Sequence, residues 1–152
     1  RSSDLVSNTT FRDTVILEQF DRDGRLVDRR ETHNLIVSAG LEWIAKFIGD
    51  TTPPANITHM GIGTGTTAPA AGNVALETPL GSRVAATRSY VASPSPRVKL
   101  TASFTGVTGA VTEEGLFNAA SDGTMQARST FGALNLTADD KLDVTHYIVP
   151  GV

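Results

Sequence analysis

The chain has 152 residues, the usual size of one domain, and at this length it is expected to bury roughly 70% of its unfolded surface. It has no cysteine, a net charge of −3 and scattered basic residues, which exclude disulfides and thiolate metal sites and make nucleic acid an unexpected partner. No apolar run approaches the ~18 residues of a membrane span, and the polar start from Arg1 to Asp4 lacks the apolar core of a signal peptide, so no membrane partner is expected.

The first predicted elements are a polar segment and a hairpin. Residues 1–13 are expected to form an N-terminal arm, and residues 14–152 a single β-rich domain. Residues 14–20 predict a strand, residues 21–24 (Asp-Arg-Asp-Gly) a turn, and residues 25–33 a return strand. Because the return strand carries five charged residues, it is expected to be an exposed or edge strand, or to lie against a polar partner surface.

Residues 34–50 are the only stretch with a helical period, and they hold the only tryptophan. A helix is predicted over about residues 38–48, with Ser38 as the N-cap and Gly49 just beyond the end. Four apolar residues at spacing i, i+3, i+4 and i+7 are expected to close the domain's own core, namely Leu41, Ile44, Ala45 and Ile48. A second apolar pair, Trp43 and Phe47, is predicted to pack at or near a subunit boundary.

The rest of the chain predicts antiparallel strands. A Pro-rich linker follows the helix at residues 51–55, and an extended Pro/Ala/Gly loop is predicted at about residues 66–78; loops of this length are usually functional or interfacial. The predicted strands are residues 56–62, 83–92, 98–104, 111–118, 124–131, 134–136 and 141–149. Two of them have a predicted inward set: Val98, Leu100, Ala102 and Phe104 in residues 98–104, and Leu142, Val144, His146 and Ile148 in residues 141–149. The fold class is therefore mainly β, an antiparallel β-sandwich or flattened barrel of about eight strands with one inserted α-helix.

Two loop segments have parts of ligand-binding motifs. Residues 61–67 (Gly-Ile-Gly-Thr-Gly-Thr-Thr) have the glycines of a phosphate cradle, but they lack the P-loop lysine, a third glycine at the dinucleotide offset and a following helix. A close backbone approach at a strand end is the favoured interpretation. Asp21, Asp23 and Gly24 are typical of the start of a calcium loop, but no Glu stands at the twelfth place, so a hairpin turn with Asx capping is favoured.

The titratable residues show no catalytic pattern. His33, His59 and His146 fall on three different predicted strands without the spacing of a zinc site, so satisfied or surface histidines are favoured. If His146 points inward, Thr or backbone groups are expected to be sufficient partners. Adjacent acids at residues 113–114 and 139–140 would point to opposite faces of a strand, so neither pair is a dyad by itself. No enzyme activity, cofactor or metal is expected.

The order and spacing of several motifs resemble small structural proteins of long-tailed bacteriophages. In the last third of the chain the motifs are residues 113–117 (Glu-Glu-Gly-Leu-Phe), 123–131 and 142–149. In the first half they are residues 23–25 (Asp-Gly-Arg), 33–40, 60–65 (Met-Gly-Ile-Gly-Thr-Gly) and 76–80. Together they cover most of residues 14–149.

Among such proteins the chain is most similar to capsid decoration (cement) proteins, and a tail or baseplate subunit is the alternative. The resemblance implies a homotrimer that binds the lattice of the major capsid protein on a virion assembled in the host cytoplasm. The candidate contacts with a neighbouring subunit or the lattice are Trp43, Phe47, Arg25, Arg29, Arg30, Arg1 and Asp4. A host-glycan-binding module is a third hypothesis, although one Trp and two Tyr leave few side chains to stack on sugars.

Overall fold

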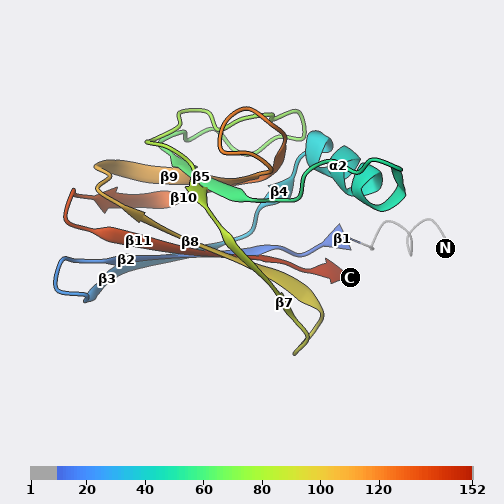
Figure 1. Ribbon diagram of the computed structural model, residues 1–152. Coiled ribbons are helices and arrows are strands. Elements are labelled where there is room, and N and C mark those ends of the chain that lie inside the picture. Colours follow the sequence, from blue (N-terminus) through green and yellow to red (C-terminus); the bar gives the residue numbers. More distant parts are fainter. Residues whose placement is uncertain (1–9, 152) are drawn as a thin grey trace.

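The computed structural model describes residues 10–151, which form two five-stranded antiparallel sheets packed as a sandwich (Figure 1). The upper sheet contains, in spatial order, β4 (Leu35–Ile36), β10 (Met125–Leu136), β9 (Gly109–Phe117), β5 (His59–Gly63) and β6 (Val84–Ala85). The lower sheet contains β3 (Leu26–Thr32), β2 (Thr14–Phe20), β11 (Lys141–Ile148), β8 (Arg97–Thr105) and β7 (Thr87–Val91). With one helix, α2 (Ser38–Gly49), in the described part of the chain, the predicted fold class is confirmed.

The core lies between the sheets because strands of the lower sheet alternate apolar and polar residues. In β8, Leu100, Ala102 and Phe104 are buried, as the sequence predicted. In β11 the whole predicted inward set is buried. The upper sheet faces them with its own buried apolar side chains, among them Met60, Ile62, Val111, Leu116 and Leu134.

The two ends of the described chain lie side by side. β1 (Thr10–Phe11) pairs with β12 (Pro150–Gly151), and the Arg12 N–H donates a hydrogen bond of 2.7 Å to the Val149 carbonyl oxygen. Asp13 is buried. Residues 10–13 of the predicted arm therefore belong to the folded domain, while residues 1–9, with Arg1 and Asp4, lie outside the described residues.

The first hairpin forms as predicted. Asp21 Oδ1 accepts hydrogen bonds from the backbone N–H groups of Asp23 and Arg25, at 2.9 and 3.0 Å, which is the expected Asx turn. The return strand β3 is an edge strand of the lower sheet, so its charged side chains stay out of the core.

Strand β10 is continuous where the sequence predicted two strands. Its pairing with β9 shifts register between Thr130 and Leu134, and such a bulge bends a strand. The bent half lies beside β3, where the Arg30 guanidinium donates to the carbonyl oxygens of Gly132 (3.0 Å) and Ala133 (2.9 Å). Arg30 thus ties the edges of the two sheets together.

The predicted strand over residues 83–92 is divided in two at Ala86. β6, before the break, pairs with β5 in the upper sheet, and β7, after it, pairs with β8 in the lower sheet. The Ala86 N–H donates to the Thr58 carbonyl oxygen at 2.9 Å. The prediction of one strand is therefore wrong, because this segment crosses from one sheet edge to the other and leaves β7 at the edge of the lower sheet.

Candidate functional site

Helix α2 lies at one end of the upper sheet and packs against β10 through Gly40 (Figure 1). A Cβ at Gly40 would stand 2.1 Å from the Gln126 carbonyl oxygen, so only glycine lets the helix backbone approach so closely. This contact places the stripe Gly40, Trp43, Ile44 and Phe47 toward the protein. The predicted stripe begins one residue later, at Leu41. Each residue rotates the side-chain direction by about 100° around the helix axis, so the predicted stripe faces another direction.

The prediction that Leu41, Ile44, Ala45 and Ile48 close the core is therefore wrong. Leu41 is 53% exposed and Ile48 82% exposed, Ala45 is exposed, and Ile44 alone is partly buried. The helix instead presents part of its apolar surface to solvent, which a soluble monomer rarely does with large side chains that lie close together.

The helix ends also differ from the prediction. Val37, not Ser38, is the N-cap residue, without a side-chain cap, and Gly49 is the last helical residue with Asp50 as the C-cap. The Val37 N–H donates to the Gln126 carbonyl oxygen and the Ser38 N–H to the Ala71 carbonyl oxygen, so neighbouring backbone satisfies two N–H groups that have no partner within the helix.

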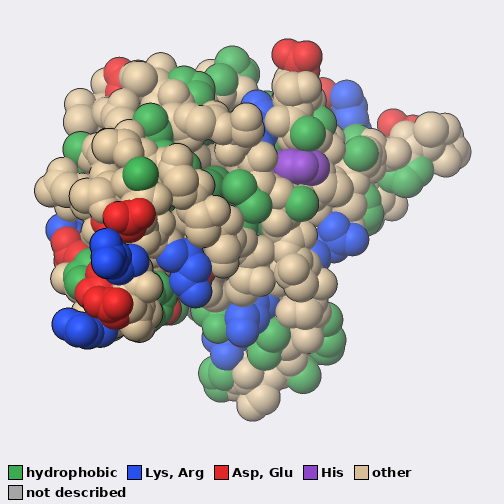
Figure 2. Space-filling view, turned by 60° about the vertical axis from the view of Figure 1, so that its left-hand side comes forward, with side chains coloured by type: hydrophobic (Ala, Val, Ile, Leu, Met, Phe, Trp, Pro, Cys, Tyr) green, Lys and Arg blue, Asp and Glu red, His purple; other side chains and the backbone are tan. Residues whose placement is uncertain are grey.

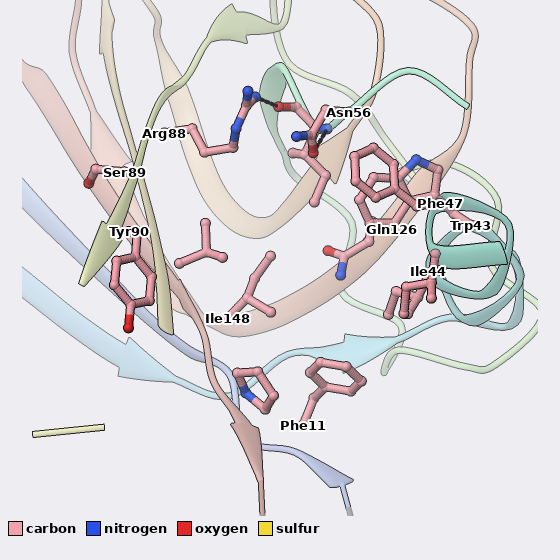
Figure 3. A pocket seen from close by; sticks show the side chains of 14 residues that line it. Phe11, Trp43, Ile44, Phe47, Asn56, Arg88, Ser89, Tyr90, Gln126 and Ile148 are labelled. Atoms are coloured by element: carbon pink, nitrogen blue, oxygen red, sulfur yellow. Dashed lines mark hydrogen bonds between the residues drawn. The ribbon is translucent and has the colours of Figure 1, made fainter. Parts of the chain in front are cut away.

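An apolar groove of about 560 Å³ lies between α2 and the end of the lower sheet (Figure 3). One wall is the helix, and the other consists of residues from β7, β8 and β11. Its lining includes Ile57 and Ile148, which belong to the buried core between the sheets. The groove is thus a continuation of that core. No side chain of the described residues fills it.

Trp43 and Phe47, predicted to pack at a subunit boundary, stand together on the helix wall with ring centroids 5.1 Å apart. Trp43 packs against the core, and its indole N–H donates to the Ala55 carbonyl oxygen at 2.8 Å, which anchors the Pro-rich linker. Phe47 is 40% exposed. A subunit contact at these two residues stays a prediction.

Gln126 is a buried polar residue within this apolar groove, and the sequence reasoning missed it. Its side chain is 2% exposed, and its amide points into the space between Ile44 and Ile148 (Figure 3). Neither Nε2 nor Oε1 has a hydrogen-bond partner among the described residues. The pairing of β10 with β9 shifts register between Met125 and Ala127, and bulges of this kind redirect side chains near functional sites.

Glu113 forms a second notable site, on the outer face of the upper sheet. Its buried carboxylate accepts hydrogen bonds from the backbone N–H groups of Gly65 (2.8 Å), Glu77 (2.9 Å) and Thr78 (2.8 Å), and from Arg128 Nε at 3.0 Å. Burial opposes ionisation of Glu113, but these donors outweigh it and hold the pKa of Glu113 below its usual value.

This carboxylate explains the glycine-rich segment that has parts of a phosphate cradle. Cβ atoms at Gly63 and Gly65 would stand 2.5 and 2.4 Å from Glu113 Oε2, so the glycines allow a close approach, as predicted. What approaches is the protein's own carboxylate. The loop predicted at about residues 66–78 is pinned at both ends by Glu113 and lies above β9 and β5 (Figure 1).

His146, on β11, packs against the inner face of β9, opposite the face that holds Glu113. It lies between two buried carboxylates. Its Nδ1 is 2.7 Å from Glu114 Oε2 and its Nε2 is 3.4 Å from Asp13 Oδ2, and all three side chains are 0% exposed. Burial alone would lower the pKa of His146, but Glu114 and Asp13 raise it to about 9, so the ring is an imidazolium at neutral pH. The expectation that Thr or backbone groups serve as its partners is wrong.

This cluster is built to hold a charge rather than to react. Ser129 Oγ donates to Glu114 Oε1 at 3.1 Å and does not contact the imidazole. A protonated, fully buried imidazolium can neither accept a proton from a nucleophile nor meet a substrate from solvent. The neighbouring acids Glu113 and Glu114 point to opposite faces, as predicted, and serve two separate clusters.

The three histidines are separated from one another. His33 Nδ1 is 2.9 Å from the Asp13 carbonyl oxygen, and His59 Nδ1 is 2.9 Å from Thr58 Oγ1. Within residues 10–151, no group of three His, Asp or Glu side chains is placed to hold a metal ion. No helix in the same range is long and apolar enough to cross a membrane.

The predicted contact arginines of β3 and its turn are placed differently from one another. Arg25 and Arg29 have exposed side chains, paired with Asp23 (3.5 Å) and Glu31 (3.1 Å). Arg30 is engaged with β10 inside the domain. In Figure 2, Lys and Arg side chains lie close to Asp and Glu on the visible face, so this surface is mixed in sign rather than a single basic patch.

No protein-family model, no curated protein sequence and no solved structure matches this chain.

Proposed function

We propose that this chain is a structural subunit of a bacteriophage particle, a capsid decoration protein that binds the expanded head and stabilises it by bridging neighbouring subunits. One observation carries the assembly role: large apolar side chains of α2 and β7 face solvent beside an apolar groove. Ile48 is 82% exposed, Tyr90 72% and Leu41 53%. Burying such side chains is worth about 1.5–3 kcal/mol each, so this surface is suited to a protein partner. The choice of a phage head rests on the motif resemblance.

The mechanism requires no chemistry. A subunit that binds the assembled shell and not its separate components shifts the equilibrium toward the shell by mass action. The buried charge clusters around Glu113 and His146 serve the subunit itself, because they hold the long loop and join the two sheets. Arg25 and Arg29, on the exposed hairpin, stay candidate contacts with a polar lattice.

A binding assay with empty expanded heads tests this function. Purified protein is expected to bind heads at a stoichiometry that matches lattice positions, and Ile48→Asp is expected to weaken binding at least tenfold, since it places a charge in the apolar contact. Thr105→Asp is the control, because Thr105 is exposed at the end of β8 away from Val98 and does not line the groove.

Other outcomes would overturn the proposal. Binding to purified tails but not to heads would identify a tail or baseplate subunit. Binding to cell-wall polysaccharide, with no binding to either particle, would identify a glycan-binding module.

A further inference from the structure

The groove runs across one face of the lower sheet, at the end where β11, β8 and β7 lie side by side. Ile148, Val98 and Tyr90 stand opposite one another on these three strands and line it. In Figure 3, Gln126 lies beyond Ile148, on the side away from Tyr90. A chain that reaches Gln126 therefore lies across the sheet face, between the sheet and α2.

Gln126 supplies polar groups on the helix side of the groove. Its unpartnered Nε2 and Oε1 offer a donor and an acceptor side by side. A peptide group in an extended chain offers the complementary pair, a C=O and an N–H. A purely apolar molecule such as a lipid chain would fill the volume but leave the amide of Gln126 unsatisfied, which is costly in a buried site.

The remaining lining fits an uncharged, apolar occupant. Arg88 is the charged residue among those that line the groove, and its Nη1 already donates to the Ile57 carbonyl oxygen at 2.6 Å. The other large side chains there, such as Trp43, Phe47 and Ile148, are apolar. The volume of about 560 Å³ lies within the ~300–1,000 Å³ typical of ligand pockets.

We propose that the groove binds an extended, apolar polypeptide segment of a neighbouring subunit, which is hydrogen-bonded through its backbone by Gln126. An extended segment of this kind takes affinity from main-chain hydrogen bonds and specificity from alternate side chains that enter the pocket. The identity of the donor as a particle subunit rests on the proposed function, whereas peptide binding itself does not.

A displayed library of random heptapeptides is the probe, selected on the wild-type protein. Enriched peptides are expected to alternate apolar and polar residues. A synthetic copy is expected to bind Gln126→Leu at least tenfold more weakly than wild type, and to lose binding when its backbone nitrogens are methylated. Gln126→Leu is expected to remain folded and to unfold at the same or a higher denaturant concentration, since it replaces an unsatisfied buried amide with an apolar side chain.

The matched control is the same substitution at a satisfied amide. Gln19 Nε2 donates to the Asn135 carbonyl oxygen and to Asp140 Oδ2, both at 2.9 Å. Gln19→Leu is therefore expected to lower the unfolding midpoint without changing peptide affinity. This opposite pattern separates a binding role for Gln126 from a structural one.

Several results would overturn the inference. These are no enriched peptide, equal binding to Gln126→Leu, unchanged binding after N-methylation, or binding of decanoate without binding of any peptide. An oligomer that Ile48→Asp dissociates and that no peptide competes with would assign the groove to a second copy of this chain. If peptide binding holds while the protein fails to bind heads, the proposed function fails and this inference stands.

Discussion

The substitution Glu113→Gln tests whether a single buried carboxylate holds the long loop to the sandwich. Each Glu113 oxygen accepts two hydrogen bonds: Oε1 from Glu77 N–H and Arg128 Nε, Oε2 from Gly65 N–H and Thr78 N–H. Glutamine has nearly the same shape but replaces one oxygen with an NH₂ donor. The two N–H groups that donate to that oxygen would then face another N–H group. Arg128 would also lose the nearer and fully buried of its two carboxylate partners, and would keep Glu77 at 3.9 Å.

The expected loss follows from these contacts. Hydrogen bonds to charged groups contribute about 1.5–3 kcal/mol each, and breaking a buried ion pair costs about 3–5 kcal/mol. These values overlap because they count the same carboxylate, so we expect Glu113→Gln to lose about 3–5 kcal/mol of unfolding free energy. For a chain of this length, each kcal/mol lowers the Tm by about 2–4 °C.

Urea unfolding gives the free energy, and amide hydrogen exchange shows where the protein loosens. The amides of Gly65, Glu77 and Thr78 are expected to lose more protection than those of β8. Because the pKa of Glu113 is lowered on folding, its stabilisation is present above the usual pKa near 4.5 and is lost as the pH falls through the lower folded value. The difference between wild type and Glu113→Gln should therefore shrink in acid.

The control is Glu77→Gln, an isosteric change at a neighbouring carboxylate. Glu77 is half-exposed and accepts hydrogen bonds from the hydroxyl and N–H of Thr67. Its loss should cost much less than that of Glu113, because solvent can replace those bonds. A change of less than about 1 kcal/mol for Glu113→Gln, or unchanged protection of the three loop amides, would refute the reasoning.

Two further substitutions test the other buried contacts. Because the pKa of His146 is raised from 6.5 to about 9 in the fold, its stabilisation is complete below pH 6.5 and is lost as the pH rises through 9. Unfolding free energy measured in urea should therefore fall between pH 7 and 10 in the wild type, and His146→Gln, which leaves Glu114 without its cation, should be less stable at pH 7 and show a flatter profile. Gly40→Ala should cost about 1–3 kcal/mol in thermal unfolding because its methyl group would meet the Gln126 carbonyl. Gly49→Ala, with no atom within 4 Å of the new methyl, should cost nothing or stabilise the helix; equal effects of the two alanines would contradict the packing of α2 on β10.

Local patterns were enough for the elements whose signal lies within a few residues. Alternation of apolar residues predicted β8 and β11 with their inward sets, and the turn at Asp21 predicted the first hairpin. The same reasoning merged β6 with β7, because nothing in residues 83–92 shows that their hydrogen-bonding partners change from one sheet to the other.

The predicted site residues depended more strongly on contacts that no local pattern contains. The helix has apolar residues around much of its circumference, so its period could not decide which stripe would be covered. Gly40 decided it, by allowing the helix backbone to touch β10, and this contact also created the groove and buried Gln126. A glycine is not counted in an apolar stripe, which is why the predicted face was one residue away.

Strand alternation and helical period along the chain therefore determined two packed β layers, one helix and a charged edge strand. Each of these follows from the spacing, within a few neighbouring residues, of the apolar side chains that are buried away from water. Tertiary structure alone decided where the buried charges find partners and where the core stays open. Asp13 and His146 are 133 positions apart, and Glu113 joins Gly65 from 48 positions away. Such partners are chosen by the stacking of the sheets, since a buried charge is tolerated only where the fold brings an opposite charge or several donors within hydrogen-bond distance.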